Sequence, residues 1–379
     1  MQKIRVLHIA KDDKFFDPTY SHFENDERLY NSAVLLVDSM QYTFKYIKNT
    51  ESVKLLANKS AIMEEFSGPY DVIYFHSIRP ELYSLIKYIP KDKIVIWWCW
   101  GYELYLTKMG MPPLISLPLY KSLTQNYIKS LKKSFTKEIK EIIKKTITGR
   151  FWVRQRNKFI SRVDYFQPVL PVEYSLMKKN RNFRAKEFYP NRETTGLLYD
   201  EKIIIGKGNI LLGNSASYEN NHLDVWSKIC DRVPSDVEVI VPLSYGIKTY
   251  ADYLSKILGN SGKKLRILLS FMPKEEYFSL LDSCSFAVFG VIRQQSMGNI
   301  YYCLQRGMKV FMYRDSLVYK ALVDTGFVLF AIEDINEESF RQPLNDEQIR
   351  KNLESLRKDL DYRCGVYERF WKDVSEELH

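Results

Sequence analysis

The sequence has few cysteines and no long apolar run. Five cysteines are scattered among 379 residues, and no two stand at Cys-x-x-Cys spacing, which argues against a disulfide framework or a zinc site. No stretch approaches the roughly 18 consecutive apolar residues that a membrane-spanning helix needs. The apolar run near Met1 is too short for a secretory signal, so we expect the protein to stay in the cytoplasm.

Common nucleotide and metal signatures are missing as well. The chain has neither a Gly-x-Gly-x-x-Gly fingerprint nor a Walker loop, so we expect neither a nicotinamide enzyme nor an ATPase. No Asp-x-Asp motif stands at a convincing position, so the sequence calls for no divalent metal, and we expect no cofactor. With 45% hydrophobic and 27% charged residues the chain is globular, and its length suits two domains that each bury a core.

Both halves alternate strands with helical stretches, which predicts parallel α/β sheets. In the first half we expect a helical stretch over 24–37 and strands at 4–9, 71–75, 93–98, 165–170 and 186–189. In the second half we expect strands at 209–212, 237–242, 265–269, 286–290 and 309–313.

A turn-rich stretch at 190–196 marks a domain boundary. We therefore predict an N-terminal domain over 1–192, a second domain over 193–345, and a helical tail over 346–379 that packs back toward the first domain. Two Rossmann-like α/β domains facing a cleft form the GT-B layout of many glycosyltransferases, with ligands at the carboxyl ends of strands. Some sugar-nucleotide 2-epimerases share this layout, so an epimerase and a non-catalytic binding protein stay open as alternatives.

Positive charge is concentrated in one segment. The chain has a formal net charge of +10, and residues 118–163 hold thirteen basic and two acidic residues. Apolar residues recur there at steps of three and four, which predicts one amphipathic helix. It could pack on the core, lie on an anionic membrane or bind nucleic acid, but no nucleic-acid motif accompanies it, so we expect no nucleic-acid partner. The candidate membrane-binding residues are Lys129, Lys132, Lys133, Lys137, Lys140, Lys144, Arg150 and Trp152.

Two loops of the second half suit a bound diphosphate. The loop beginning Gly213-Asn214-Ser215 follows a strand, where small residues let backbone N–H groups approach a ligand. Its polar residues could equally cap the next helix. The run 293–299 begins with an arginine at the start of another helix, and a guanidinium with free helix N–H groups suits a pyrophosphate. The alternative is an arginine paired with a nearby carboxylate.

The motifs in these loops resemble glycosyltransferase family 56. The matching pieces are Ile-Leu-Leu-Gly-Asn-Ser at 210–215 with Asn221-His222, Val-Pro-Leu-Ser-Tyr-Gly at 241–246 with Tyr250, Arg293-Gln294-Gln295 with Gly298, and Leu304-Gln305 with Gly307. Weaker similarities in the first half lie at Asp13, 25–26, 75–76 and 100–105. The family comprises 4-alpha-L-fucosyltransferases that act as TDP-N-acetylfucosamine:lipid II N-acetylfucosaminyltransferases.

The resemblance implies a GT-B fold and an inverting, metal-independent transfer. Its donor is dTDP-4-acetamido-4,6-dideoxygalactose, and its acceptor is an undecaprenyl-diphosphate-linked saccharide at the cytoplasmic face of the bacterial inner membrane, where the protein would bind peripherally. The residue before Glu103 and the long basic segment depart from the family pattern, so the acceptor or the donor sugar can differ. The runner-up is therefore a GT-B transferase that uses another nucleotide sugar in capsule or O-antigen assembly.

Inversion needs one general base near the acceptor hydroxyl and a stabilised leaving group. Asp13, after the first strand, is the leading candidate base, and His76 and Glu103 are next. Asp13 could instead cap a turn, and His76 could be a core histidine. The candidate donor-binding residues are Gly213, Asn214, Ser215, Asn221, Ser244, Tyr245, Gly246, Tyr250, Phe271 (by contact with the nucleotide base), Arg293, Gln294, Gln295, Gly298 and Asn299.

Overall fold

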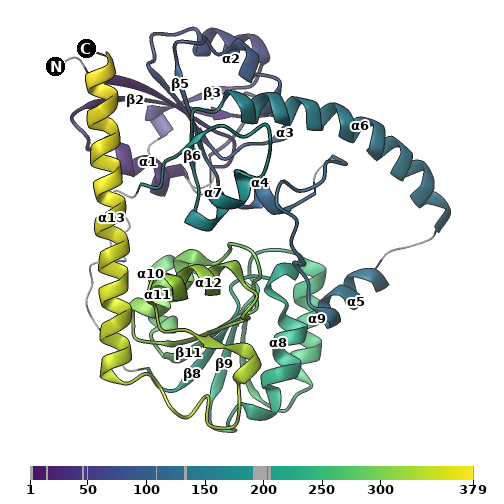
Figure 1. Cartoon of the computed structure of the whole chain (residues 1–379). Helices are drawn as coiled ribbons and strands as arrows, with labels where there is room; N and C mark the ends of the chain where they lie inside the picture. The colour runs from purple at the N-terminus through teal and green to yellow at the C-terminus, as the bar shows by residue number, and fades with distance from the viewer. Residues whose placement is uncertain are drawn as a thin grey trace. The chain divides into compact units, whose positions relative to one another are not determined.

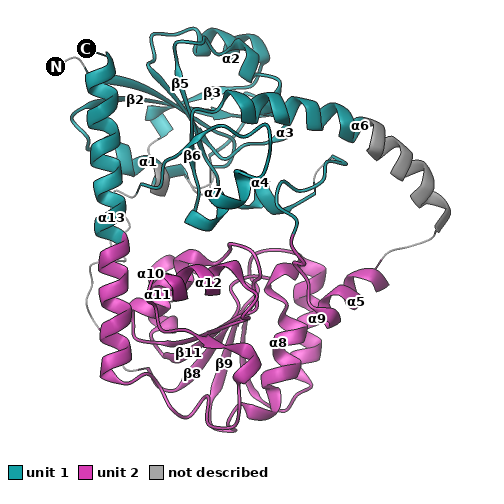
Figure 2. Cartoon of the chain, in the orientation of Figure 1, with its two compact units in different colours: residues 1–116, 135–195, 360–379 teal, residues 117–134, 196–359 magenta. Residues whose placement is uncertain are grey.

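The computed structural model divides the chain into two compact units (Figure 2). Unit 1 comprises residues 1–116, 135–195 and 360–379, and unit 2 comprises residues 117–134 and 196–359. The residues that the structure describes are 3–13, 16–44, 47–48, 50–107, 109–131, 135–190, 203 and 206–378, without the side chains of 18–19 and 135–147. The turn-rich stretch expected at the domain boundary lies almost wholly outside them.

Unit 1 is built on a seven-stranded parallel sheet in the order β3-β2-β1-β4-β5-β6-β7 (Figure 1). Its strands are β1 (Ile4–Ala10), β2 (Leu29–Leu36), β3 (Val53–Leu56), β4 (Val72–His76), β5 (Ile94–Trp98), β6 (Tyr165–Gln167) and β7 (Lys186–Glu187). The central strands are short apolar runs, as expected for a parallel sheet with both faces covered. The helices of this unit are α1 (Phe16–Glu24), α2 (Lys59–Phe66), α3 (Pro80–Tyr83), α4 (Tyr102–Tyr105), α6 (Phe135–Arg162) and α7 (Pro171–Met177).

The helical stretch expected over 24–37 is wrong, because most of it forms β2. Leu29, Ala33 and Leu36 have helical spacing, yet Ala33 to Leu36 are all buried. Ala33 to Leu35 pair with β1 on one side and β3 on the other. A strand buried on both faces reads as a continuous apolar run, and periodicity alone does not separate it from a buried helix.

Unit 2 carries a six-stranded parallel sheet in the order β10-β9-β8-β11-β12-β13. Its strands are β8 (Asn209–Leu212), β9 (Glu238–Pro242), β10 (Lys264–Leu268), β11 (Cys284–Phe289), β12 (Lys309–Met312) and β13 (Phe330–Ala331). Its helices are α5 (Ser122–Ser130), α8 (His222–Ile229), α9 (Lys248–Gly259), α10 (Lys274–Leu281), α11 (Met297–Gln305) and α12 (Leu317–Asp324). In each unit the alternation of strands and helices gives the Rossmann-like arrangement.

The basic segment 118–163 is two helices, not the single helix expected. The first, α5, belongs to unit 2, because Asp224 of α8 accepts hydrogen bonds from the backbone N–H groups of Leu123 (2.7 Å) and Thr124 (2.9 Å). Tyr127 of α5 also stacks on Tyr253 of α9, with ring centroids 4.2 Å apart. The second helix, α6, belongs to unit 1.

The last helix, α13 (Asp346–Leu378), contributes to both units. In unit 2, Asn352 is buried and its side chain accepts a hydrogen bond from the backbone N–H of Val328 at 2.6 Å. In unit 1, Tyr367, Phe370 and Trp371 pack with β1 and β4 in one buried cluster. Within the described part of the chain, no helix combines the length and apolar character needed to cross a lipid bilayer.

Candidate functional site

The candidate site of unit 2 lies at the carboxyl ends of β8 and β11. From β8 the following strands are added toward one edge of the sheet, and from β11 they are added toward the other edge. Sheets of α/β proteins bind ligands at such a switch point. The loop 213–217 follows β8, and the loop 290–296 follows β11 and leads into α11. The fold therefore places the two sequence-predicted loops side by side.

Hydrogen bonds join these two loops. The Gln295 side-chain nitrogen donates to the Ser217 hydroxyl at 2.9 Å, and the Asn221 side-chain nitrogen donates to the Gly290 carbonyl at 2.7 Å. A Cβ on Gly290 would lie 2.2 Å from the backbone oxygen of Asn220. Only a residue without a side chain allows this approach. Asn221 is fully buried and holds the two loops together, so it does not face a ligand.

Gly213 is required by its own conformation and by a buried histidine. Its φ is +67°, and a Cβ there would lie 2.5 Å from Nε2 of His222. Burial lowers the pKa of His222 to about 3, so this ring is neutral at pH 7. No described residue hydrogen-bonds either ring nitrogen of His222. A neutral imidazole with unused polar atoms therefore lies directly under the loop.

Arg293 is a buried cation whose partners are incomplete. The residue is only 9% exposed. Its Nη1 donates to the Gln294 carbonyl at 2.7 Å, its Nη2 lies 3.7 Å from the Glu219 carboxylate, and no described residue accepts from its Nε. Buried guanidinium groups normally have their hydrogen bonds satisfied. This arrangement is what an anion-binding arginine needs.

More polar atoms without partners surround this arginine. Among the described residues, none pairs with the side-chain oxygens of Gln294, Gln295, Ser296 and Asn220. Ser296 precedes α11 with a φ of +66° and makes no side-chain cap, which leaves the first N–H groups of α11 available to a ligand. The neighbouring Gly298 has open space where a Cβ would stand. The N–H groups at the helix start can bind an anion, whereas the unpaired amide oxygens can accept hydrogen bonds from a donor such as a hydroxyl.

A third loop adjoins the first. Ala216 and Gly246 form a β-bridge, and Gly246, with a φ of +115°, would place a Cβ 2.6 Å from the Ala216 backbone. Ser244 and Tyr245 before it are exposed. Ser215 is buried, and its hydroxyl hydrogen-bonds Asn214 Oδ1 at 3.3 Å.

Of the other predicted donor residues, one is a core residue, one is exposed in a different loop, and one lies in the first turn of α11 and bonds another helix. Tyr250 is fully buried among the rings of Tyr127, Tyr218 and His222, so it is a core residue in this structure. Phe271 is 76% exposed in the loop after the edge strand β10, which is outside the core. Asn299 donates to the Tyr277 hydroxyl at 2.9 Å and so joins α11 to α10.

In unit 1 the strand order turns between β1 and β4, and two of the three candidate bases lie there. Asp13 is buried in the loop after β1, and His76 is the last residue of β4. Glu103 instead organises backbone: its carboxylate accepts from the N–H groups of Ile78 (3.2 Å) and Trp100 (3.1 Å), and burial raises its pKa. Its oxygens therefore already accept hydrogen bonds from the loops after β4 and β5.

Sequence reasoning missed two functional candidates, His8 and Glu219. His8 lies within an apolar strand and gave no local signal, and it contacts His76 only through the sheet register. Glu219 follows the predicted loop after β8, and its pairing with Arg293 depends on the sheet order.

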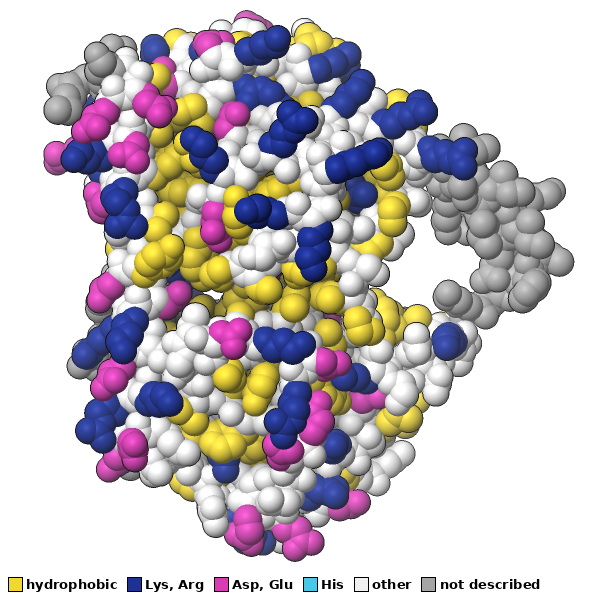
Figure 3. Space-filling model, viewed as in Figure 1, with side chains coloured by type: hydrophobic (Ala, Val, Ile, Leu, Met, Phe, Trp, Pro, Cys, Tyr) yellow, Lys and Arg dark blue, Asp and Glu magenta, His cyan; other side chains and the backbone are white. Residues whose placement is uncertain are grey.

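The candidate membrane residues are only partly described. Lys129 is exposed on α5, and on α6 Arg150 is exposed and Trp152 is half-buried. Lys132 and Lys133 lie outside the described residues, as do the side chains of Lys137, Lys140 and Lys144 on α6. On the face shown in Figure 3, Lys and Arg side chains gather over the described part of α6.

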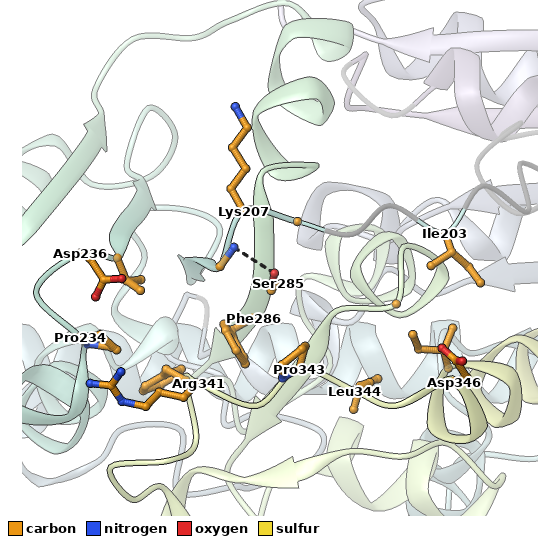
Figure 4. Close-up of a pocket in the computed structure, with 16 residues that line it drawn as sticks. Ile203, Lys207, Pro234, Asp236, Ser285, Phe286, Arg341, Pro343, Leu344 and Asp346 are labelled. Atoms are coloured by element: carbon orange, nitrogen blue, oxygen red, sulfur yellow. Dashed lines mark hydrogen bonds between the residues drawn. The ribbon is translucent and has the colours of Figure 1, made fainter.

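A cavity of about 510 Å³ lies at the opposite edge of the unit 2 sheet (Figure 4). It is lined by residues that precede or begin β8, β9 and β11, such as Gly208, Val237 and Phe286. In Figure 4 the Lys207 side chain points away from the other labelled residues. Because ligands of such sheets bind at the carboxyl ends of the strands, this cavity is not the candidate site.

Comparisons with known proteins agree with this architecture. Similar solved structures include the N-terminal domain of Candida albicans trehalose-6-phosphate phosphatase (TM-score 0.64, 9% identity, covering 98% of this chain and 96% of that one). They also include HepE of Anabaena in complex with UDP and glucose (TM-score 0.59, 10% identity, covering 99% of this chain and 99% of that one). A third is the trehalose 6-phosphate synthase of Burkholderia multivorans (TM-score 0.58, 8% identity, covering 100% of this chain and 98% of that one). At these identities the likeness shows the fold, which is GT-B.

The family assignment comes from sequence. The model of 4-alpha-L-fucosyltransferase, glycosyl transferase group 56, matches residues 163–375, more than half of the chain. The match includes the whole of the candidate site in unit 2. The chain therefore belongs to glycosyltransferase group 56, the 4-alpha-L-fucosyltransferases, and is an enzyme of the GT-B fold.

Proposed function

We propose that this glycosyltransferase moves a 4-acetamido-4,6-dideoxygalactose residue from a dTDP donor to an undecaprenyl-diphosphate-linked saccharide, with inversion and without a metal ion. The family to which the chain belongs supports a fucose-type sugar. The observation that carries the donor part is Arg293, a buried cation with an incomplete set of partners. A nucleoside diphosphate supplies the anion that this arginine lacks.

Arg293 and α11 together suit the charge of the leaving group. A departing nucleoside diphosphate gains negative charge as its bond to the sugar breaks, and fixed donors at that position stabilise the transition state. The guanidinium can bind two phosphate oxygens, and the N–H groups at the start of α11 can bind others. The side-chain oxygens of Gln294 and Gln295 have no partner among the described residues and can accept hydrogen bonds from hydroxyls of the sugar.

The acceptor is activated by a group of unit 1. The candidate bases at the carboxyl edge of that sheet are Asp13 and His76, and the Glu103 oxygens are engaged by backbone N–H groups. An inverting transfer needs only one such base, because the acceptor oxygen displaces the diphosphate in one step.

We also propose that α6 holds the enzyme on the cytoplasmic face of the bacterial inner membrane. A lipid-linked acceptor is present only at that surface. Arg150 and Phe151 are both exposed on α6, which pairs a cation with an apolar ring, and lysines precede them along the helix. Such a helix binds anionic headgroups through its basic residues while its apolar groups enter the interface.

Binding of dTDP, UDP and GDP tests the donor assignment directly. We expect dTDP at 100 times its dissociation constant to stabilise the protein by about 2.7 kcal/mol in thermal unfolding. Arg293→Gln should weaken dTDP binding roughly 10- to 100-fold, the cost of losing a charge-assisted hydrogen bond. Arg266→Gln, an exposed arginine on the edge strand β10, is the matched control and should bind normally.

The outcomes separate the parts of the proposal. Preference for UDP or GDP would keep the transferase but replace the donor with another nucleotide sugar. Absence of any stabilisation by the three nucleotides would reject the donor site, as would equal affinity for dTDP in the Arg293→Gln variant and the wild type.

A further inference from the structure

A chain of hydrogen bonds crosses the sheet of unit 1 and ends at His76. The parallel register pairs His8 of β1 with Ala33 of β2 and with Tyr74 of β4. Residues two positions away share the same face, so Asn31 and His76 both reach the His8 ring. His8 Nε2 lies 3.0 Å from Asn31 Oδ1, and His8 Nδ1 lies 2.9 Å from His76 Nε2.

The first member of this chain fixes the position of every proton. The Asn31 side-chain nitrogen donates to the Phe23 carbonyl at 2.9 Å, so the Asn31 oxygen faces His8 and can only accept. His8 therefore carries its proton on Nε2, and its Nδ1 accepts the Nε2 proton of His76. The Nδ1 atom of a neutral His76 is then left with a lone pair.

Both rings are neutral at pH 7. Burial lowers the pKa of His8 to about 4, and burial together with the nearby His8 and His22 holds the pKa of His76 well below its usual value. The other titratable groups around the pair are Tyr20 of α1 and Tyr74 of β4. The remaining rings packed on the pair carry no charge and belong to Phe16, Phe23 and Trp98.

The lone pair of His76 Nδ1 is unused by the protein. The ring is fully buried, and no described residue hydrogen-bonds this nitrogen. Buried polar atoms are nearly always paired, so an exception at the end of a strand requires a reason. This strand end lies at the switch point of the sheet, where ligands of such folds bind. An unprotonated imidazole nitrogen with a fixed tautomer is what a general base requires.

On the basis of the proposed function, we propose that His76 Nδ1, in place of Asp13, takes the proton of the acceptor hydroxyl, and that His8 and Asn31 are positioning residues that fix its tautomer. The acceptor oxygen forms a bond to the anomeric carbon, and the bond from that carbon to the diphosphate breaks with its electron pair on the leaving oxygen. The hydroxyl proton moves to Nδ1 and passes to solvent after product release. The Nε2–H of His76 donates its hydrogen bond to His8 Nδ1 throughout.

The tautomers can be tested without substrate. The full chain contains five histidines, so ¹⁵N-labelled histidine gives few signals in NMR. We expect His8 and His76 to be neutral near pH 7, each with its proton on Nε2, assigned by comparison with the His8→Gln and His76→Gln variants. A charged His76, or one with its proton on Nδ1, would overturn the proposal.

The pH dependence of kcat/KM tests the positioning role. Asn31→Asp places a carboxylate on His8, which favours the protonated form of the pair and should move the acidic limb of the profile up by about one pH unit or more. A merely structural asparagine would not move this limb. Asn58→Asp is the matched control, because Asn58 caps α2 through its side-chain oxygen and Asp caps equally well.

His76→Gln should lower kcat at least about 100-fold and leave dTDP affinity, measured by calorimetry, within twofold. Unchanged dTDP binding also shows that this variant is folded. An acidic limb that stays in place in Asn31→Asp, or one that is lost in Asp13→Asn and kept in His76→Gln, would overturn the role of His76. Failure of the wild type to bind dTDP would instead overturn the proposed donor.

Discussion

Arg293 and Glu219 form a loose ion pair, with 3.7 Å between Nη2 of the guanidinium and the nearest carboxylate oxygen. Both side chains are nearly buried, so the pair is little screened by solvent. A hydrogen bond would need a distance near 2.8 Å. Glu219 therefore compensates the charge of Arg293 only partly. The carboxylate partner that the sequence left open as the alternative is therefore present, and the anion site stays a prediction.

Removing the carboxylate should strengthen nucleotide binding. Glu219 competes with a diphosphate for the same guanidinium and repels its charge, so we expect Glu219→Gln to lower the dissociation constant for dTDP about threefold to tenfold. Calorimetry measures the change. Glu238→Gln, at the amino end of β9, is the control and should have no effect. Weaker binding in Glu219→Gln would show that this carboxylate supports the site instead of competing with its ligand.

Gly213→Ala tests the contact between the first loop and the buried histidine. The new Cβ would stand 2.5 Å from His222 Nε2 in a left-handed conformation, so the free energy of unfolding should fall by about 1–3 kcal/mol. Urea unfolding measures this loss. Gly259→Ala is the control, because its Cβ would meet nothing within 4 Å at the end of α9. Equal stability of the two variants would mean that the loop moves aside at no cost.

The buried Glu173 should make the free energy of unfolding fall from acid to neutral pH. Burial raises the pKa of this carboxyl to about 7 in the folded protein, above its ordinary value near 4.5. Between these values the folded state holds a proton that the unfolded state has lost. Raising the pH therefore lowers the free energy of unfolding by up to about 3 kcal/mol, and this decrease ends above pH 7. Urea unfolding of Glu173→Gln should show a flatter pH profile. Glu81→Gln, exposed on α3, should keep the wild-type profile, and the same profile in Glu173→Gln would contradict this origin.

The strands were largely predictable because buried parallel strands are short apolar runs between turn residues. The exception is β2, where apolar residues at helical spacing hide a strand buried on both faces. The separate start of α5 was not visible either. It is fixed by Asp224, which accepts from the backbone N–H groups of Leu123 and Thr124 from a helix about 100 residues away, and no local signal reports such a contact.

The site was predictable as loops but not as contacts. Small residues and an arginine after strands marked the two loops of unit 2, and the strand order brings them together. Tyr250 shows the limit, since a motif position that follows a loop can still face the core. The partners of His76 were equally hidden, because sheet register alone aligns His8 with Asn31 and His76.

Membrane attachment through α6 makes a prediction that depends on charge. Each lysine near an anionic surface contributes on the order of 1 kcal/mol, so replacing Lys137, Lys140 and Lys144 by glutamine should weaken binding to phosphatidylglycerol vesicles by about 100-fold. Cosedimentation at low salt measures it, and added salt should release the wild type because it screens these charges. The matched control replaces the exposed Lys351, Lys358 and Lys372 of α13. Equal losses in both triple variants would trace binding to net charge alone, and no wild-type binding would leave α6 without a membrane role.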